Sequence, residues 1–189
     1  MRIIILVSFL SLISCLNSNQ YSEVSRIIKF EKFIGHKKAL ALNEKVANFE
    51  TFLNENYPRQ SLKDAYEKYL EVIRDGEYDK INWRYNMTNQ DSIENLFERN
   101  GLREEIWNYE DSDPITEQRV RKFNRFGKYL KGLELIQGSD STIINYIKIK
   151  KAVGDVSKNI LADGLLKSNA DFSDYFIKRI IVVEFYPAN

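Results

Sequence analysis

Apolar residues in several segments of this chain recur at three- and four-residue steps, which is the spacing of one face of an α-helix. The clearest segment begins at Lys38 and continues to the residue before Pro58, where the helical conformation is disfavoured. Its apolar positions are Leu42, Val46, Phe49 and Leu53. A second helix is expected from Ser61, which can form a capping pair with Asp64, to about Arg74. The sequence therefore predicts a mainly α fold.

The segment from Pro114 to Ile136 predicts the longest helix, because proline is preferred in the first helical turn. One side of this helix would carry apolar residues such as Phe126 and Leu130. Arg121, Arg125 and Lys128 follow the i, i+4, i+7 spacing on the opposite side. We interpret these three residues as a candidate binding face for anionic lipid or an acidic partner.

Residues 141–167 are also helical by pattern. Their apolar stripe consists of Ile149, Val153, Val156 and Ile160, which are four, three and four residues apart. Gly154 lies in the middle of this segment, and glycine costs about 1 kcal/mol relative to alanine inside a helix. We therefore expect one kinked helix here. Shorter helices are expected over residues 92–100 and 102–109.

The two ends of the chain differ from this pattern. Residues 24–34 fit both a strand and a helix, whereas Arg179–Tyr186 is rich in β-branched and aromatic residues and predicts a strand. That strand could pair with one over Ile27–Phe33. The expected fold class is a mainly α, helical bundle-like single domain over residues 24–189, in which the N- and C-terminal segments can form a small β pair.

Composition excludes several kinds of site. One cysteine and one histidine leave too few ligands for an ordinary zinc or copper centre, and a single cysteine forms no internal disulfide. His36 has no nucleophile motif around it, so we interpret it as a surface residue. Glu104 and Glu105 would point about 100° apart on a helix, which suits a shared acid–base site poorly. We predict no catalytic residue, no metal and no cofactor.

Two aromatic pairs, Trp83 with Tyr85 and Trp107 with Tyr109, lie in an acidic stretch and could stack on a sugar. Core packing is the commoner role of large aromatic residues. The acidic stretch is one part of an uneven charge distribution. Residues 58–113 hold 14 acidic and 8 basic side chains, whereas residues 114–189 hold 8 acidic and 13 basic ones. This asymmetry fits either complementarity between packed helices, the commoner case, or a basic surface for a partner.

The first fifteen residues predict where the protein resides. Arg2 precedes the apolar run Ile3–Leu12, which is too short to span about 30 Å of hydrocarbon as a helix. Ser14 then places a small residue directly before Cys15. This arrangement resembles the lipobox of bacterial lipoproteins. The resemblance implies cleavage before Cys15 and attachment of lipid to its thiol.

Under this resemblance residues 1–14 are a signal peptide, and residues 15–23 are the lipidated cysteine and a short polar tether. In Gram-negative lipoproteins an Asp after the cysteine causes retention in the inner membrane, so Leu16 implies the outer membrane. Loss of Arg2 lowers the Lys and Arg total from 28 to 27, equal to the 27 Asp and Glu. A neutral chain argues against a nucleic-acid partner.

These observations predict a lipid-anchored protein of the bacterial cell envelope. We expect it to act by binding or assembly, with the membrane and a protein or glycan of the envelope as partners. The alternative is an envelope enzyme that acts on glycan or peptidoglycan through carboxylates, because that chemistry requires neither a metal nor a histidine.

Overall fold

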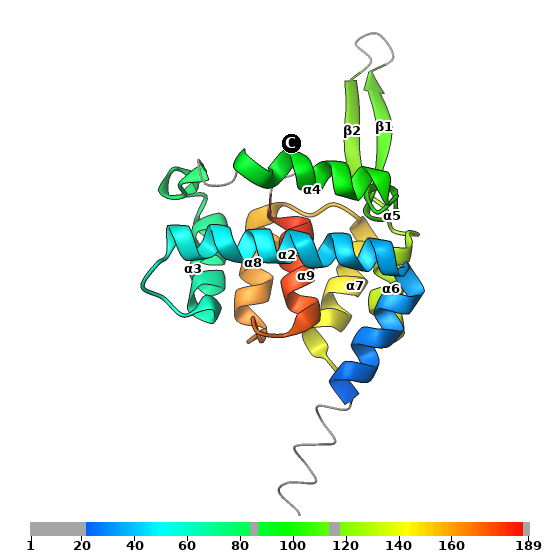
Figure 1. Ribbon diagram of the computed structural model, residues 1–189, viewed down its shortest axis with the longest axis horizontal. Coiled ribbons are helices and arrows are strands. Elements are labelled where there is room, and N and C mark those ends of the chain that lie inside the picture. Colours follow the sequence, from blue (N-terminus) through cyan, green and yellow to red (C-terminus); the bar gives the residue numbers. More distant parts are fainter. Residues whose placement is uncertain (1–21, 84–86, 114–117, 187–189) are drawn as a thin grey trace, which may run out of the picture.

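The computed structural model describes residues 22–83, 87–113 and 118–186. This part of the chain is mainly helical with one small antiparallel sheet, which confirms the predicted fold class (Figure 1). The first helix covers residues 22–34. The other elements are α2 (His36–Asn56), α3 (Leu62–Asp75), the 3-10 helix η1 (Tyr78–Lys80), α4 (Met87–Arg99), α5 (Arg103–Ile106), β1 (Trp107–Asp113), β2 (Gln118–Phe123), α6 (Lys128–Ile136), α7 (Ser141–Val153), α8 (Lys158–Lys167) and α9 (Tyr175–Glu184).

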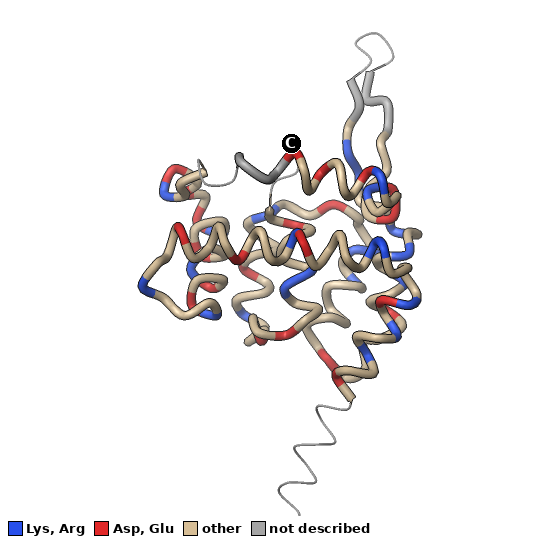
Figure 2. The backbone as a smooth tube through the Cα atoms, viewed as in Figure 1, with Lys and Arg blue, Asp and Glu red and all other residues tan. Residues whose placement is uncertain are grey.

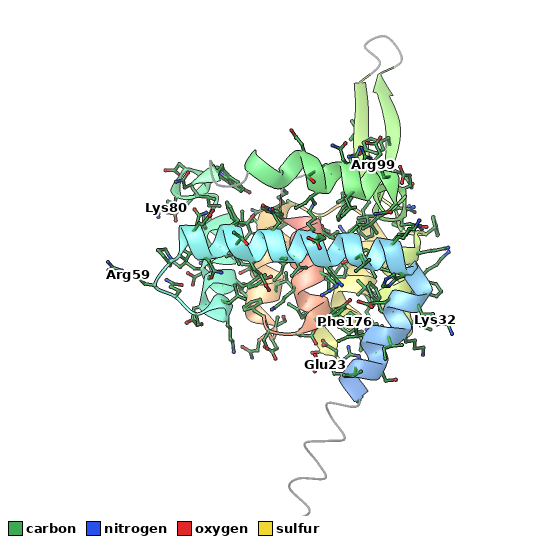
Figure 3. All side chains as sticks on the ribbon, viewed as in Figure 1. Glu23, Lys32, Arg59, Lys80, Arg99 and Phe176 are labelled. Atoms are coloured by element: carbon green, nitrogen blue, oxygen red, sulfur yellow. The ribbon has the colours of Figure 1, made fainter. Side chains whose placement is uncertain are left out.

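Helix α2 crosses the front of the molecule in Figure 1, and the other helices pack around it. α9 passes behind α2, α3 packs against α8 at one end, and α6 packs against α7 towards the other end. The β1–β2 hairpin projects from the body. Side chains fill the space between the helices, with Phe176 inside the bundle and Lys32, Arg59 and Lys80 at its edges (Figure 3). No helix in the described ranges is both long and apolar enough to cross a membrane.

The helices predicted before Pro58 and after Ser61 are both present. α2 ends at Asn56, two residues before Pro58. α3 begins after Ser61, whose side-chain oxygen accepts a hydrogen bond from the backbone N–H of Asp64 at 3.2 Å. Gly76 ends α3 in the left-handed region, with φ of 74°. These boundaries depend on local signals, so the sequence pattern located them.

The predicted strand Arg179–Tyr186 is wrong, because most of this segment belongs to α9. Since residues 22–34 are helical as well, the two ends of the domain form no β pair with each other. Asp174 caps α9 by accepting hydrogen bonds from two backbone N–H groups at 2.7 and 3.0 Å. The run from Ile180 to Val183 is buried on every side. A helix surrounded by other elements must be apolar all round, which explains the misleading composition.

The predicted helix Pro114–Ile136 is also wrong over most of its length. Residues 118–123 form β2, which pairs with β1, and only Lys128–Ile136 is helical. Residues 114–117 lie outside the described part of the chain. The register places Trp107 opposite Phe123, and both are buried, so this pair anchors the hairpin to the core. The helix expected over residues 102–109 is shortened to α5 for the same reason.

Residues 141–167 form two helices, α7 and α8, and not one kinked helix. Gly154 follows α7 with φ of 73°, a conformation that ends a helix, and α8 begins only at Lys158. The break changes the direction of the chain. As a consequence, the apolar stripe predicted for this segment is divided among α7, the link over residues 154–157 and α8.

Candidate functional site

The three residues of the predicted binding face do not share one helix face. Arg121 lies in β2, and its guanidinium carbon is 4.7 Å from the centroid of the Trp107 ring. Arg125 lies in the turn after β2, and Lys128 begins α6. The backbone N–H of Lys128 donates to the Glu105 carboxylate at 2.8 Å. Successive side chains of a strand point to opposite faces of the sheet, so the i, i+4, i+7 spacing does not place residues of β2 on one face. Of the three, Arg125 lies beside the surface described next.

An open groove with a volume of about 630 Å³ lies between α7 and α8. Its walls carry large aliphatic side chains that are exposed: Ile149 by 41 %, Val153 by 63 % and Ile160 by 64 %. Single exposed aliphatic residues are ordinary, but several that line one groove are typical of an interaction site. We call this feature the α7–α8 groove.

The break at Gly154 creates this groove. All four residues of the predicted stripe line it: Ile149, Val153, Val156 and Ile160. The core-facing side of α7 carries other residues, chiefly Ile143 and Ile147, which are buried. Three residues of the stripe, Ile149, Val153 and Ile160, therefore form a second apolar surface outside the core, whereas Val156 is partly buried against it.

Val153 connects the groove to a neighbouring hollow of about 400 Å³ at the base of the hairpin. Phe126, the most exposed large apolar residue described at 75 %, lines this hollow together with Lys122 and Arg125. Asp155 also lines it, but both of its carboxylate oxygens accept a backbone hydrogen bond from β2, at 3.1 and 3.2 Å. The apolar surface thus continues into a region that is basic in character.

The surroundings of the groove are positively charged. Lys148 is the charged residue of the groove lining, which contains no carboxylate. The ion pairs between described residues do not join the acidic segment 58–113 to the basic segment 114–189. Figure 2 shows basic residues on β2 where the hairpin meets the body. Among the residues whose side chains are described, the positive excess of the C-terminal half is not paired directly with the acidic half.

A buried polar network fixes the floor of the groove. Tyr146 lines the groove and donates from its hydroxyl to Glu184 at 2.6 Å. Burial and then the Glu184 charge raise the pKa of Tyr146 well above its ordinary value, so the phenol stays a neutral donor. Lys150 is 1 % exposed, with Nζ 2.9 Å from Glu184 and 4.1 Å from the Phe123 ring centroid. The network joins α7, α9 and β2, so the groove has a rigid base.

The histidine and the two adjacent glutamates considered from the sequence lie at the surface or in an ion pair. His36 is exposed at the start of α2. Glu104 is exposed, whereas Glu105 forms an ion pair with Lys38. Burial acts to raise the pKa of Glu105, but hydrogen bonds from Lys38 and a backbone N–H outweigh it and leave that pKa below its ordinary value. A carboxylate held in its ionised form in this way is unsuited to general-acid catalysis.

The members of the two aromatic pairs differ in their surroundings. Trp107 is buried and stacks on Phe97, with ring centroids 6.4 Å apart, so it belongs to the core. Tyr109 is 46 % exposed on β1. Tyr85 lies outside the described residues. Trp83 stacks on Phe52 at 5.7 Å.

A second buried cation, Lys45, ties α4 to α2. It is 1 % exposed, and its Nζ lies 3.1 Å from Glu94 and 4.8 Å from the Phe97 ring centroid. Burial lowers the pKa of Lys45, and the Glu94 carboxylate opposes that shift. The aromatic and acidic contacts of this ammonium account for its burial without a ligand.

The exposed aliphatic lining makes the α7–α8 groove the candidate binding surface of the described residues. The helical spacing related four of the groove residues to one another but could not tell that they point outward. The signal available was a surplus of aliphatic residues around Gly154. No protein-family model matched the chain, and comparisons with curated proteins and with solved structures also found no match.

Proposed function

We propose that this protein is a lipid-anchored cell-envelope protein that acts by binding a partner protein in the α7–α8 groove. The observation that carries the binding part is the exposed aliphatic lining of the groove beside basic residues. The anchoring part rests on the lipobox resemblance at Cys15, which lies outside the described residues. Leu16 supports the outer membrane as the location. The first helix begins by residue 22, so the polar tether is shorter than the sequence suggested.

The shape of the groove favours a helical segment as its occupant. A membrane surface is penetrated by convex apolar side chains, whereas Ile149, Val153 and Ile160 line a concave groove between two helices. An amphipathic helix lays its apolar face into such a groove. Because Lys148 and Arg125 lie at or near the groove, the partner segment would carry acidic residues beside its apolar face.

Replacing Cys15 with Ala should abolish lipid attachment, because the thiol is the acyl acceptor. In cells grown with a labelled fatty acid, the wild-type band should carry label and the Cys15→Ala band should not. Ser14→Ala is the matched control, since it keeps a small residue before the cysteine and should keep the label. An unlabelled wild type would reject the anchor.

Replacing Val153 and Ile160 together with Glu should weaken partner binding about tenfold or more, because it removes two apolar contacts and adds repulsive charge. Both side chains are largely exposed, so stability should change by no more than about 0.5 kcal/mol for each. The measurement compares the yield of cross-linked adduct with and without the two replacements. It uses a photo-crosslinking amino acid at position 149 of the full chain in its native membranes. Mass spectrometry should map the adduct to an acidic, amphipathic segment of a protein.

The matched control is Val24→Glu with Leu40→Glu, which makes the same charge change at two aliphatic residues that are 49 % and 47 % exposed. This variant should leave the adduct unchanged. Adducts with lipid alone would assign the groove to the membrane. A cross-linked segment that is basic, or no adduct at all, would reject the proposed occupant.

A further inference from the structure

A separate hollow of about 300 Å³ lies where the C-terminal ends of α3 and α9 meet the start of α8. Five residues line it: Ile73, Tyr78, Trp83, Lys158 and Phe185. Four of these side chains are apolar or aromatic, and the fifth is a cation. We call this feature the Trp83 pocket.

The aromatic walls of the Trp83 pocket are held in place. Phe52 stacks on Trp83 at an interplanar angle of 25°, which covers one face of the indole. The Trp83 Nε1 donates to the backbone carbonyl of Tyr78 at 3.2 Å, so the indole is tied to the segment that carries the phenol ring. Phe185 and Ile73 are buried and close the inner side. The pocket is therefore preformed, with flat apolar walls.

Lys158 contributes the positive charge of the pocket. It is exposed, and no carboxylate among the described residues forms an ion pair with it. Glu184, whose charge acts on Lys158, is already bound by Lys150 and Tyr146. Partial desolvation and then the charge of Arg121 lower the pKa of Lys158. The Lys158 ammonium is therefore available to an anion in the pocket.

We propose that the Trp83 pocket binds a small aromatic carboxylate, with its ring against Tyr78 and Trp83 and its carboxylate at the Lys158 ammonium. One cation balances one negative charge, which favours a carboxylate over a doubly charged phosphate. The pocket walls provide few polar groups for the hydroxyls of a sugar, which favours a flat apolar ring. The volume suits a ligand of one ring, at the lower end of the usual range for small-molecule sites. This inference is independent of the α7–α8 groove.

The test compares 3-phenylpropionate with its neutral amide, 3-phenylpropionamide. The chain has two tryptophans, so Trp107→Phe leaves Trp83 as the single fluorescent reporter of the pocket. The acid should change Trp83 emission saturably, and the amide should bind about tenfold more weakly, as expected for loss of one charge-assisted contact. Calorimetry on the unsubstituted full chain makes the same comparison without the Trp107 replacement.

Lys158→Met should remove the preference for the acid and leave the weak binding of the amide unchanged. Lys167→Met, at the other end of α8 and largely exposed, should change neither affinity. No saturable binding of the acid, equal affinity for the acid and the amide, or an unaltered preference in Lys158→Met would overturn the proposal. Circular dichroism of each variant establishes that the comparison is between folded proteins.

Discussion

Replacing Glu184 with Ala should lower the free energy of unfolding by about 3–5 kcal/mol, because it leaves the Lys150 ammonium buried without a partner. Lys150 is 1 % exposed and Glu184 is 12 % exposed at the side chain, so water cannot replace the lost carboxylate well. The Tyr146 hydroxyl loses its acceptor at the same time. Urea denaturation followed by circular dichroism measures the change.

The double variant Glu184→Ala with Lys150→Met should recover most of the lost stability, since an apolar pair of similar volume is often neutral in place of a buried ion pair. If the double variant is as unstable as Glu184→Ala alone, the loss comes from the cavity at Glu184 and not from the orphaned charge. Partner binding in the α7–α8 groove should weaken in the single variant, because Tyr146 links the groove lining to this network.

Replacing Gly127 with Ala should destabilise the fold by about 3 kcal/mol or more, through overlap with backbone atoms. A Cβ at this position would lie 1.9 Å from the carbonyl oxygen of Glu105 and 2.8 Å from its carbonyl carbon. The φ of Gly127 is −70°, which any residue adopts, so the cost is steric and not conformational. Relief would require α5 to move, which would disturb the Glu105 contacts with Lys38 and with the first residue of α6.

Gly164→Ala is the matched control, because a Cβ there meets nothing within 4 Å and the residue lies inside α8. This change should stabilise the protein by up to about 1 kcal/mol, from the higher helix propensity of alanine. Thermal and urea unfolding of both variants make the comparison. Similar stabilities for Gly127→Ala and Gly164→Ala would show that α5 and α6 are not packed as closely as described.

The candidate site was only partly predictable. All three residues of the predicted basic face were placed by helical spacing on a segment that is not continuously helical, and of the three Arg125 lies beside the α7–α8 groove. Four of the residues that line the groove were recognised from the sequence as a stripe. The Trp83 pocket joins residues from α3 to the end of α9, which no local pattern relates.

The sequence by itself determined the mainly α class, the end of α2 and both ends of α3, because a proline limit, the Ser61 cap and the Gly76 end act on their immediate neighbours. Only the tertiary structure decided the states of three segments. Ile180 to Val183 is helical because the segment is packed on all sides, and the burial of an apolar helix outweighs the strand propensity of these residues. β2 is a strand because the backbone groups of β1 form hydrogen bonds with it. The stripe from Ile149 to Ile160 faces outward because periodicity tells which residues share a face, while the fold of the chain sets the direction in which that face points.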